Sequence, residues 1–310
     1  MLHSPAPMHI PDGFLSLAVS VICWIITAAL VAVAVARLNR TLDDRQVPLM
    51  GVMAAFIFAA QMINFPVAGG TSGHLLGGAL AAILLGPWAG ILVMTAVIAV
   101  QGLLFQDGGL LAMGANILNM GVLSVTIGYG LYRLVLGGSR RLRLAGAGVA
   151  AWFSVMTGAL ATALQLWLSG NARPGLIFPA MLGVHALIGI GEGLITAATL
   201  AFIFRVRPDL VEEKGIPRGG GGWALAGLLI ALVIAVLSPL ASTDPDGLER
   251  VAINLGFIRK TLPNPYLSLP DYTLPFLGPT PLSTILAGIL GVLVVAGLVF
   301  LTVRLLRRRG

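Results

Sequence analysis

The chain has 310 residues, of which 57% are hydrophobic and only 10% are charged, with a net charge of +7 and a mean hydropathy of +0.96. Soluble domains carry about 25% charged residues, so this composition excludes a soluble globular protein and predicts an integral membrane protein. Its apolar runs approach the roughly 20 residues that a helix needs to cross a bilayer, which favours helices over a barrel of alternating strands.

The predicted fold class is all-α and polytopic, with seven membrane helices, a linker and two further helices. The third helix is short, and the Leu85-Gly86-Pro87 break after it predicts a tight helical hairpin. The single cysteine, Cys23, lies in the first helix and has no partner for a disulfide or a thiolate metal site. The predicted helices are 14–36, 48–65, 73–85, 88–105, 111–134, 145–169, 179–204, 223–240 and 281–303.

Four segments follow from this pattern. Residues 1–7 form an extension that precedes Met8, and residues 8–206 form the seven-helix membrane domain. Residues 207–222 are a cytoplasmic linker that ends in four glycines, which predicts a flexible tether. Residues 223–310 hold the last two helices and, between them, a long Pro-rich outside loop.

The basic residues set the expected orientation. With the amino terminus outside and the carboxyl terminus inside, fifteen of the 19 Lys and Arg residues fall on the inside. The four on the outside are Arg173, Arg250, Arg259 and Lys260. The basic excess is therefore a topology signal, and we expect no nucleic-acid binding.

Several polar residues gather in the outer half of the predicted helices. Polar groups in hydrocarbon are costly, so they face the bundle interior or a wet cavity, either as interhelical hydrogen-bond partners or as functional groups. Glu192 lies deeper, on the same helix face as His185, and three glycines around it favour a structural role at a close helix approach. The outer polar residues are Asn64, His74, Gln101, Asn116, Asn119, Gln165 and His185.

His9 and His74 both lie in outside segments that we expect to be flexible. The Pro11-Asp12-Gly13 turn would fold Met8 and His9 back over the helix mouth, and a Gly-rich loop precedes His74. If Met8 were the first residue, its amine, the His9 amide nitrogen and the His9 imidazole would form a compact chelate. His74 would then close a plane of four nitrogens, which is the geometry of Ni(II) or Cu(II).

Four stretches carry a resemblance to a known family. They are "MHIPDGFLS", "FAAQMINFPVAGGTSGHLLGGALAAILLGPWAG", "QDGGLLAMGANILNMG" and "GVHALIGIGEGLIT". They resemble the M component (CbiM or NikM type) of energy-coupling-factor (ECF) transporters for cobalt and nickel. The likeness runs from Met8 to Phe204, and the tail, with "PDGLE" from Pro245 to Glu249, is similar to the small N component.

The resemblance implies a substrate-binding subunit and not an enzyme. Ni(II) or Co(II) is the transported substrate, held by Met8, His9 and His74, and no cofactor is expected. Asn64, Gln101, Asn116, Asn119 and His185 would stand behind these ligands. The implied location is the cell membrane. The implied partners are a transmembrane coupling protein and a pair of cytoplasmic ATPases. The chain has no G-x-x-x-x-G-K-[ST] motif of its own, so ATP would be hydrolysed by those partners.

Some alternatives stay open at this point. Translation could begin at Met8, the extension could be removed, or the mature chain could begin at Met1, where Met1-Leu2-His3 itself has an amine-x-x-His order. A self-sufficient cation channel or secondary carrier is the main rival function. A membrane metalloenzyme is disfavoured because no H-E-x-x-H motif occurs. The role of the PDGLE loop and the choice between nickel and cobalt are also open.

Overall fold

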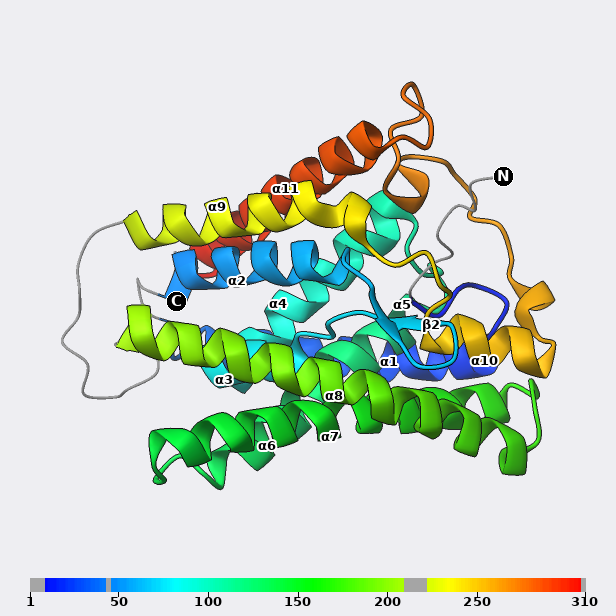
Figure 1. Ribbon diagram of the computed structural model, residues 1–310, viewed down its shortest axis with the longest axis horizontal. Coiled ribbons are helices and arrows are strands. Elements are labelled where there is room, and N and C mark those ends of the chain that lie inside the picture. Colours follow the sequence, from blue (N-terminus) through cyan, green and yellow to red (C-terminus); the bar gives the residue numbers. More distant parts are fainter. Residues whose placement is uncertain (1–8, 43–45, 209–221, 308–310) are drawn as a thin grey trace.

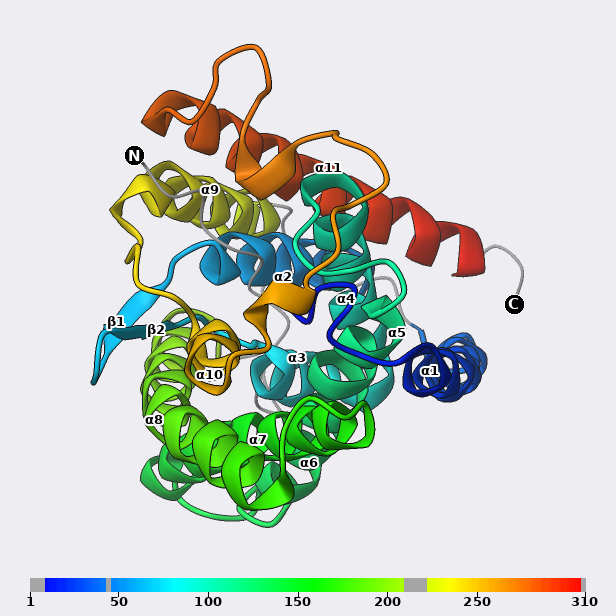
Figure 2. The same cartoon turned by 90° about the vertical axis from the view of Figure 1, so that its right-hand side faces the viewer.

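The computed structural model describes residues 9–42, 46–208 and 222–307. The described residues form a bundle of roughly parallel helices whose amino-terminal segment, β2 and α10 lie at one end, whereas α11 ends at the other (Figure 1). Figure 2 looks onto the first of these ends, where the loops gather. Met8, the extension before it and most of the predicted linker fall outside the described residues.

Six helices in this part of the chain are long and apolar enough to cross a membrane, which confirms a polytopic, largely helical membrane protein. The prediction of nine spans was too generous by that measure, because three segments are shorter or interrupted.

The elements are α1 (Leu17–Leu38), α2 (Gln46–Gln61), β1 (Phe65–Val67), β2 (Thr71–Gly73), α3 (Gly78–Leu85), α4 (Pro87–Val100), the π-helix η1 (Gln101–Phe105), α5 (Met113–Asn116), the π-helix η2 (Ile117–Leu123), α6 (Ser124–Arg133), α7 (Arg140–Leu168), α8 (Pro174–Val206), α9 (Gly222–Leu237), the 3₁₀ turn η4 (Ser238–Leu240), α10 (Gly247–Leu255), the 3₁₀ turns η5 (Ile258–Lys260) and η6 (Pro270–Tyr272), and α11 (Pro281–Arg307).

Local signals fix several helix ends. The Ser16 hydroxyl accepts the Val19 N–H at the start of α1, and the Asp246 carboxylate accepts the Glu249 N–H at the start of α10. Helix α8 begins at Pro174, earlier than the predicted start at Pro179. A proline fits the first turn of a helix, where its missing N–H is not needed, so Pro174 rather than Pro179 marks the beginning.

The third predicted helix, 73–85, was wrong in its first half. Residues 71–73 form a short strand, β2, that pairs antiparallel with β1, and α3 is only eight residues long. Gly77 has a φ of 82°, which glycine adopts without strain and which interrupts a helix. The predicted hairpin is present, because Gly86 (φ 80°) turns the chain and Pro87 starts α4.

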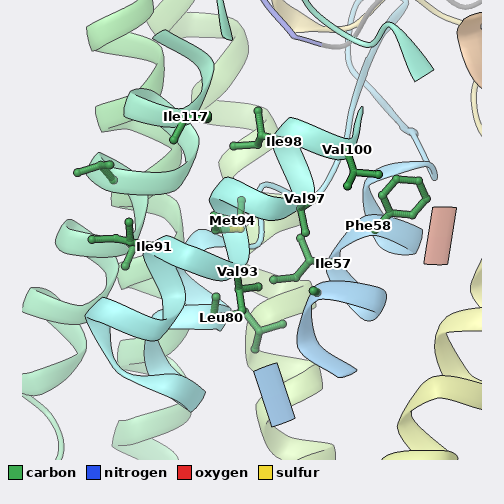
Figure 3. Close-up of a cluster of buried hydrophobic side chains, with 14 of the residues drawn as sticks. Ile57, Phe58, Leu80, Ile91, Val93, Met94, Val97, Ile98, Val100 and Ile117 are labelled. Atoms are coloured by element: carbon green, nitrogen blue, oxygen red, sulfur yellow. The ribbon is translucent and has the colours of Figure 1, made fainter. Parts of the chain in front are cut away.

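The core lies between α2, α3 and α4. Figure 3 shows Ile57 and Phe58 of α2 meeting Val93, Val97 and neighbouring side chains of α4. Ile57, Phe58, Val93 and Val97 are completely buried. In a membrane the alternative to these contacts is lipid rather than water, so they stabilise the bundle through close packing.

Helices α7 and α8 approach closely at a pair of glycines, as the glycines around Glu192 predicted. A methyl group on Gly193 would lie 2.8 Å from the carbonyl oxygen of Gly148. Small residues allow helix backbones to touch in a membrane, where packing drives association. This contact fixes α8, and with it His185 and Glu192, against the rest of the bundle.

The tail after the linker packs on the first part of the chain. Helices α9 and α11 lie beside α2 (Figures 1 and 2). The outside loop, whose role the sequence left open, contains α10 and two 3₁₀ turns. Val251 and Ala252 of α10 are buried, since the amphipathic helix lies against the outer part of α8.

Candidate metal centre

The segment that carries His9 is buried, although we expected it to be flexible and unpacked. His9 is 2% exposed, and the apolar Ile10 and Phe14 beside it are 3% and 2% exposed. Asn116 holds the segment by a reciprocal pair: its Oδ1 accepts the Ile10 N–H (3.0 Å) and its Nδ2 donates to the Ile10 carbonyl (3.1 Å). Buried polar backbone needs such partners, so the amide fixes the chain next to His9.

The predicted Pro-Asp-Gly turn is present and has a second use. Gly13 takes a φ of 92°, and the Phe14 N–H donates to the Pro11 carbonyl at 3.4 Å. The Asp12 carboxylate accepts the N–H groups of Leu110 and Ala112, both at 3.0 Å. The turn therefore joins the amino-terminal segment to the loop that leads into α5.

His74 follows the β1–β2 hairpin, in which Gly69 and Gly70 make the turn with positive φ angles of 75° and 65°. It is 8% exposed, so this loop too is packed rather than free, and its Nδ1 lies 3.0 Å from the Leu75 carbonyl oxygen. Directly after it, the Glu192 carboxylate accepts the N–H groups of Leu76 (2.6 Å) and Gly77 (2.9 Å). Glu192 thus secures the His74 loop to α8, which is a structural role.

The two histidines face each other although they come from different loops. Their ring centroids are 5.9 Å apart at an interplanar angle of 62°. A cavity of about 70 Å³ adjoins both rings, and Asn116, Asn119 and His185 also line it. Within the residues that the structure describes, no three His, Cys, Asp or Glu side chains are placed to hold a metal ion together.

Three of the five predicted supporting residues lie at this cavity. Besides Asn116, Asn119 donates to Thr162 and exchanges hydrogen bonds with Gln165. His185 is half-buried, and its Nδ1 lies 2.7 Å from the Met181 carbonyl oxygen rather than beside Glu192.

The other two predicted supporting residues are elsewhere. Asn64 lines a second cavity, of about 560 Å³, together with residues of the tail. Gln101 is completely buried at the start of η1 and does not line this cavity, although its backbone carbonyl accepts the Asp107 N–H at 3.1 Å and its side chain neighbours the Tyr272 hydroxyl. The position of a residue along a predicted helix indicates how deep it lies in the membrane. It does not show which face of the helix the side chain occupies.

Sequence reasoning did not single out Asp107 as a site residue. The Asp107 Oδ1 lies 2.9 Å from the ring nitrogen Nδ1 of His9 and also accepts the backbone N–H of His9 at 3.3 Å. The Asp107 Oδ2 accepts the Tyr272 hydroxyl at 2.7 Å. Asp107 is 3% exposed and follows Gln106, which has a left-handed φ of 59° after the π-helix. The π-helix η1 ends two residues before Asp107, and π-helices are frequent at functional sites.

Burial and charge act on these groups in opposite directions. Burial alone would lower the pKa of His9, but the Asp107 carboxylate outweighs it, so the pKa of His9 is raised. Burial would raise the pKa of Asp107, but His9 outweighs it and that pKa is lowered. Burial raises the pKa of the nearby Asp246 to about 7. An ion pair between His9 and Asp107 is the consistent result.

The tail covers the His74 side of the centre. The Ser72 N–H donates to the Pro245 carbonyl (2.9 Å), and the Ser72 hydroxyl donates to the Asp244 carbonyl (2.7 Å). Leu248 lines the cavity between the histidines. The PDGLE segment therefore docks at the hairpin before His74, which was one of the two possibilities left open by the sequence.

Comparison with known proteins shows the family of the chain. Residues 9–210 match the CbiM family, described as "Cobalt uptake substrate-specific transmembrane region". The chain belongs to this family. Residues 221–308 match the PDGLE domain, so the resemblance to an M component fused to an N-like tail is confirmed. CbiM proteins are transport proteins, not enzymes.

Relatives support the assignment along nearly the whole chain. A fused NikMN protein of Archaeoglobus fulgidus, named for nickel transport, is 41% identical over 97% of this chain and 99% of its own. The fused nickel transport protein NikMN of Rhodobacter capsulatus is 31% identical, with 94% and 96% covered. A crystal structure of a truncated transition metal transporter superposes with a TM-score of 0.58 at 33% identity, covering 64% of this chain and 99% of that one.

Proposed function

We propose that this CbiM-family protein is the substrate-capturing subunit of an ATP-driven ECF-type importer that takes up Ni(II) or Co(II) at the outer face of the cytoplasmic membrane. The observation that carries the proposal is the pairing of His9 and His74 at the loop-bearing end of the bundle. Both residues are buried, and their ring centroids are 5.9 Å apart. The names of the relatives, which refer to nickel and cobalt transport, agree with imidazole ligation.

The proposed ligands are the Met8 amine, the His9 amide nitrogen, His9 Nδ1 and His74 Nε2. His74 Nδ1 faces the Leu75 carbonyl oxygen, so the tautomer with the proton on Nδ1 leaves the lone pair on Nε2. Side chains of the described residues do not form a metal site by themselves, so backbone nitrogens are needed. Four nitrogens in a plane suit Ni(II). The metal is the transported substrate, and no cofactor is proposed.

The proposed organisation is an extension at 1–7, a metal-binding membrane domain at 8–206, a cytoplasmic linker at 207–222 and an N-like domain at 223–310. The amino terminus is placed outside, because the outer end carries few basic residues whereas Arg304 and Arg307 end α11 at the opposite end. A coupling protein and an ATPase pair complete the importer. Ala28, Ala32 and Ala36 of α1 are exposed and offer a smooth face for a partner helix.

Uptake measurements test the function. Cells or liposomes that contain this chain with its coupling protein and ATPases should accumulate Ni(II) or Co(II) only when the ATPases can hydrolyse ATP. An ATPase pair with its P-loop lysine replaced is the matched control. Uptake that persists with the inactive ATPases would instead establish a self-sufficient channel or carrier.

The terminal amine needs its own experiment, because Met8 lies outside the described residues. Metal analysis and the intact mass of the purified protein together report the substrate and the first residue. A chain that starts at Met8 should bind metal tightly, whereas a chain with an alanine retained before Met8 should bind far more weakly. The added peptide bond turns a basic amine into an amide that must lose a proton before it binds metal. Equal affinities would exclude the amine as a ligand.

A further inference from the structure

One carboxylate oxygen occupies the edge of His9 that the proposed metal would use. Asp107 Oδ1 is within 2.9 Å of His9 Nδ1 and accepts the His9 N–H at 3.3 Å, so it bridges both nitrogens. A metal ion bound to both nitrogens lies about 2 Å from each, on the same side. The oxygen and the ion therefore cannot occupy these positions together, and Asp107 has to withdraw when metal arrives.

The second oxygen of this carboxylate belongs to a contact with the tail. Asp107 Oδ2 accepts the hydroxyl of Tyr272 at 2.7 Å. The Tyr272 ring is stacked on Phe105, with centroids 4.8 Å apart and an interplanar angle of 17°. Tyr272 is 6% exposed, so it reaches into the metal-binding domain as a buried anchor.

The backbone at this anchor is strained. Asp271 and Tyr272 have φ angles of 50° and 55°, and neither is a glycine. Such conformations are unfavourable for residues other than glycine and persist only when surrounding contacts impose them. Three neighbouring contacts attach the tail to the segment that bears Asp107: the Leu269 N–H donates to the Leu104 carbonyl (3.1 Å), the Tyr266 hydroxyl donates to the Leu103 carbonyl (2.8 Å), and the Gln106 amide donates to the Tyr266 carbonyl.

We infer that Asp107 is a latch on the metal-binding edge of His9 and that Tyr272 of the tail is the anchor that receives the latch when metal displaces it. In the latched state His9 and Tyr272 share the carboxylate. In the loaded state His9 is bound to metal, and Asp107 keeps its hydrogen bond from the Tyr272 hydroxyl. A buried carboxylate that has given up its pairing with His9 depends more on the hydrogen bonds that remain, so the hydroxyl matters more to the loaded state than to the latched one.

This inference rests on the proposed function and assigns the tail a part in metal capture. Tyr272 also lines the cavity of about 560 Å³ on the tail side, whose wall includes Asp246 and Asp271. The anchor thus stands between that cavity and the latch. The tail can favour capture through this one hydroxyl, without supplying a ligand itself.

A double-mutant cycle on the purified full chain tests the inference, with Ni(II) as the probe at one fixed pH. Tyr272→Phe keeps the ring stacked on Phe105 but removes the hydroxyl, and we expect the affinity for Ni(II) to fall about five- to tenfold. Asp107→Ala removes the latch, and we expect faster association of Ni(II). In the Asp107→Ala background, Tyr272→Phe should have a much smaller effect, because the bond from the hydroxyl to the carboxylate is already absent.

Tyr266→Phe is the matched control, since its hydroxyl joins the tail to Leu103 without touching Asp107. It should leave Ni(II) affinity unchanged. Thermal unfolding of each variant separates a loss of affinity from a loss of folding. The inference would be overturned if Tyr272→Phe left the Ni(II) affinity unaltered. It would also be overturned if Tyr272→Phe reduced the affinity equally in the wild-type and the Asp107→Ala backgrounds. A wild-type chain that binds neither Ni(II) nor Co(II) would overturn the proposed function together with it.

Discussion

The two histidine loops of the candidate centre are held in different ways. The His9 segment is fixed by side chains of the loop between η1 and α5, chiefly the Asn116 amide and the Asp107 carboxylate. The His74 loop is fixed at its backbone, by Glu192 of α8 on one side and by the tail on the other. The contact to the His9 ring is ionic, whereas the contacts around His74 are hydrogen bonds to main-chain groups.

This difference means that the two loops should respond to different changes. Altered charge or pH should act first on His9, because its ring is paired with a carboxylate. Altered helix packing or tail docking should act first on His74, because its neighbours in sequence are attached to α8 and α10. Five measurements would sharpen or break this comparison.

The largest effect is expected from His74→Ala. Loss of a proposed ligand should reduce metal affinity by more than about a hundredfold, which exceeds the usual cost of altering only a partner of a ligand. His185→Ala is the matched control, since His185 lines the same cavity but is bonded to the Met181 carbonyl; it should affect stability more than affinity. Metal titration of both purified variants tests this prediction. An equal loss of metal affinity in both would contradict the assignment of His74 as a ligand and of His185 as a residue that only lines the cavity.

A strong pH dependence should follow. Protons compete with metal for the proposed amine, the proposed amide nitrogen and the His9 ring, so affinity should fall by about tenfold per pH unit for each proton displaced. Because the pKa of His9 is raised, the part of the fall that is due to its ring should begin at a pH above the usual pKa of imidazole. Asp107→Asn removes the charge that raises the pKa, and burial then lowers it, so the fall should begin at a lower pH. Titrations at a series of pH values in both proteins measure the midpoint, and an unmoved midpoint would contradict the ion pair.

Asn116→Ala should loosen the His9 segment alone. It leaves the Ile10 N–H without its buried partner, whereas the Ile10 carbonyl keeps the Gly109 N–H at 3.0 Å, and we expect metal affinity to fall about tenfold or more. Asn119→Ala provides the comparison, because Asn119 lines the same cavity but is bonded to α7. A larger loss in Asn119→Ala would show that the cavity wall, not the backbone of the His9 segment, sets the geometry.

Glu192→Gln should loosen the His74 loop. One carboxylate oxygen becomes an NH₂ group that faces a backbone N–H, which leaves a buried donor unsatisfied at a cost of about 1–3 kcal/mol. We expect a lower unfolding temperature and a smaller loss of metal affinity than in Asn116→Ala. Thermal unfolding with and without metal measures both quantities. Complete loss of binding with normal expression would make Glu192 a functional group rather than a structural one.

The smallest effect is expected from Ser72→Ala. It removes the hydroxyl bond to the Asp244 carbonyl but keeps the bond from the Ser72 N–H to the Pro245 carbonyl. A single hydrogen bond of this kind contributes about 0.5–1.5 kcal/mol, so the tail should become easier to cleave by protease while metal affinity changes little. An unchanged protease sensitivity would show that the tail is held elsewhere.

The sequence determined the membrane class, the family and most helices, because hydrophobic runs and basic flanks are local properties that length and composition report directly. It also placed His9 and His74 at the same end of the bundle, and it predicted the Pro-Asp-Gly turn and the hairpin at Gly86. Its failures concern packing: the two histidine loops were expected to be exposed, and residues 73–77 were expected to be helical.

Only the tertiary structure decided which side chains meet. Asp107 and Tyr272 are far apart in the sequence, and no periodicity connects either of them to His9, yet all three form one buried chain of contacts. Asn64 and Gln101 do not line the cavity between the histidines: α2 ends at Gln61, so Asn64 lies in the segment before β1, and for Gln101 depth along a helix left the rotation of the helix undetermined. Local pattern thus determined what each segment is, whereas contacts between distant segments determined what surrounds the histidines.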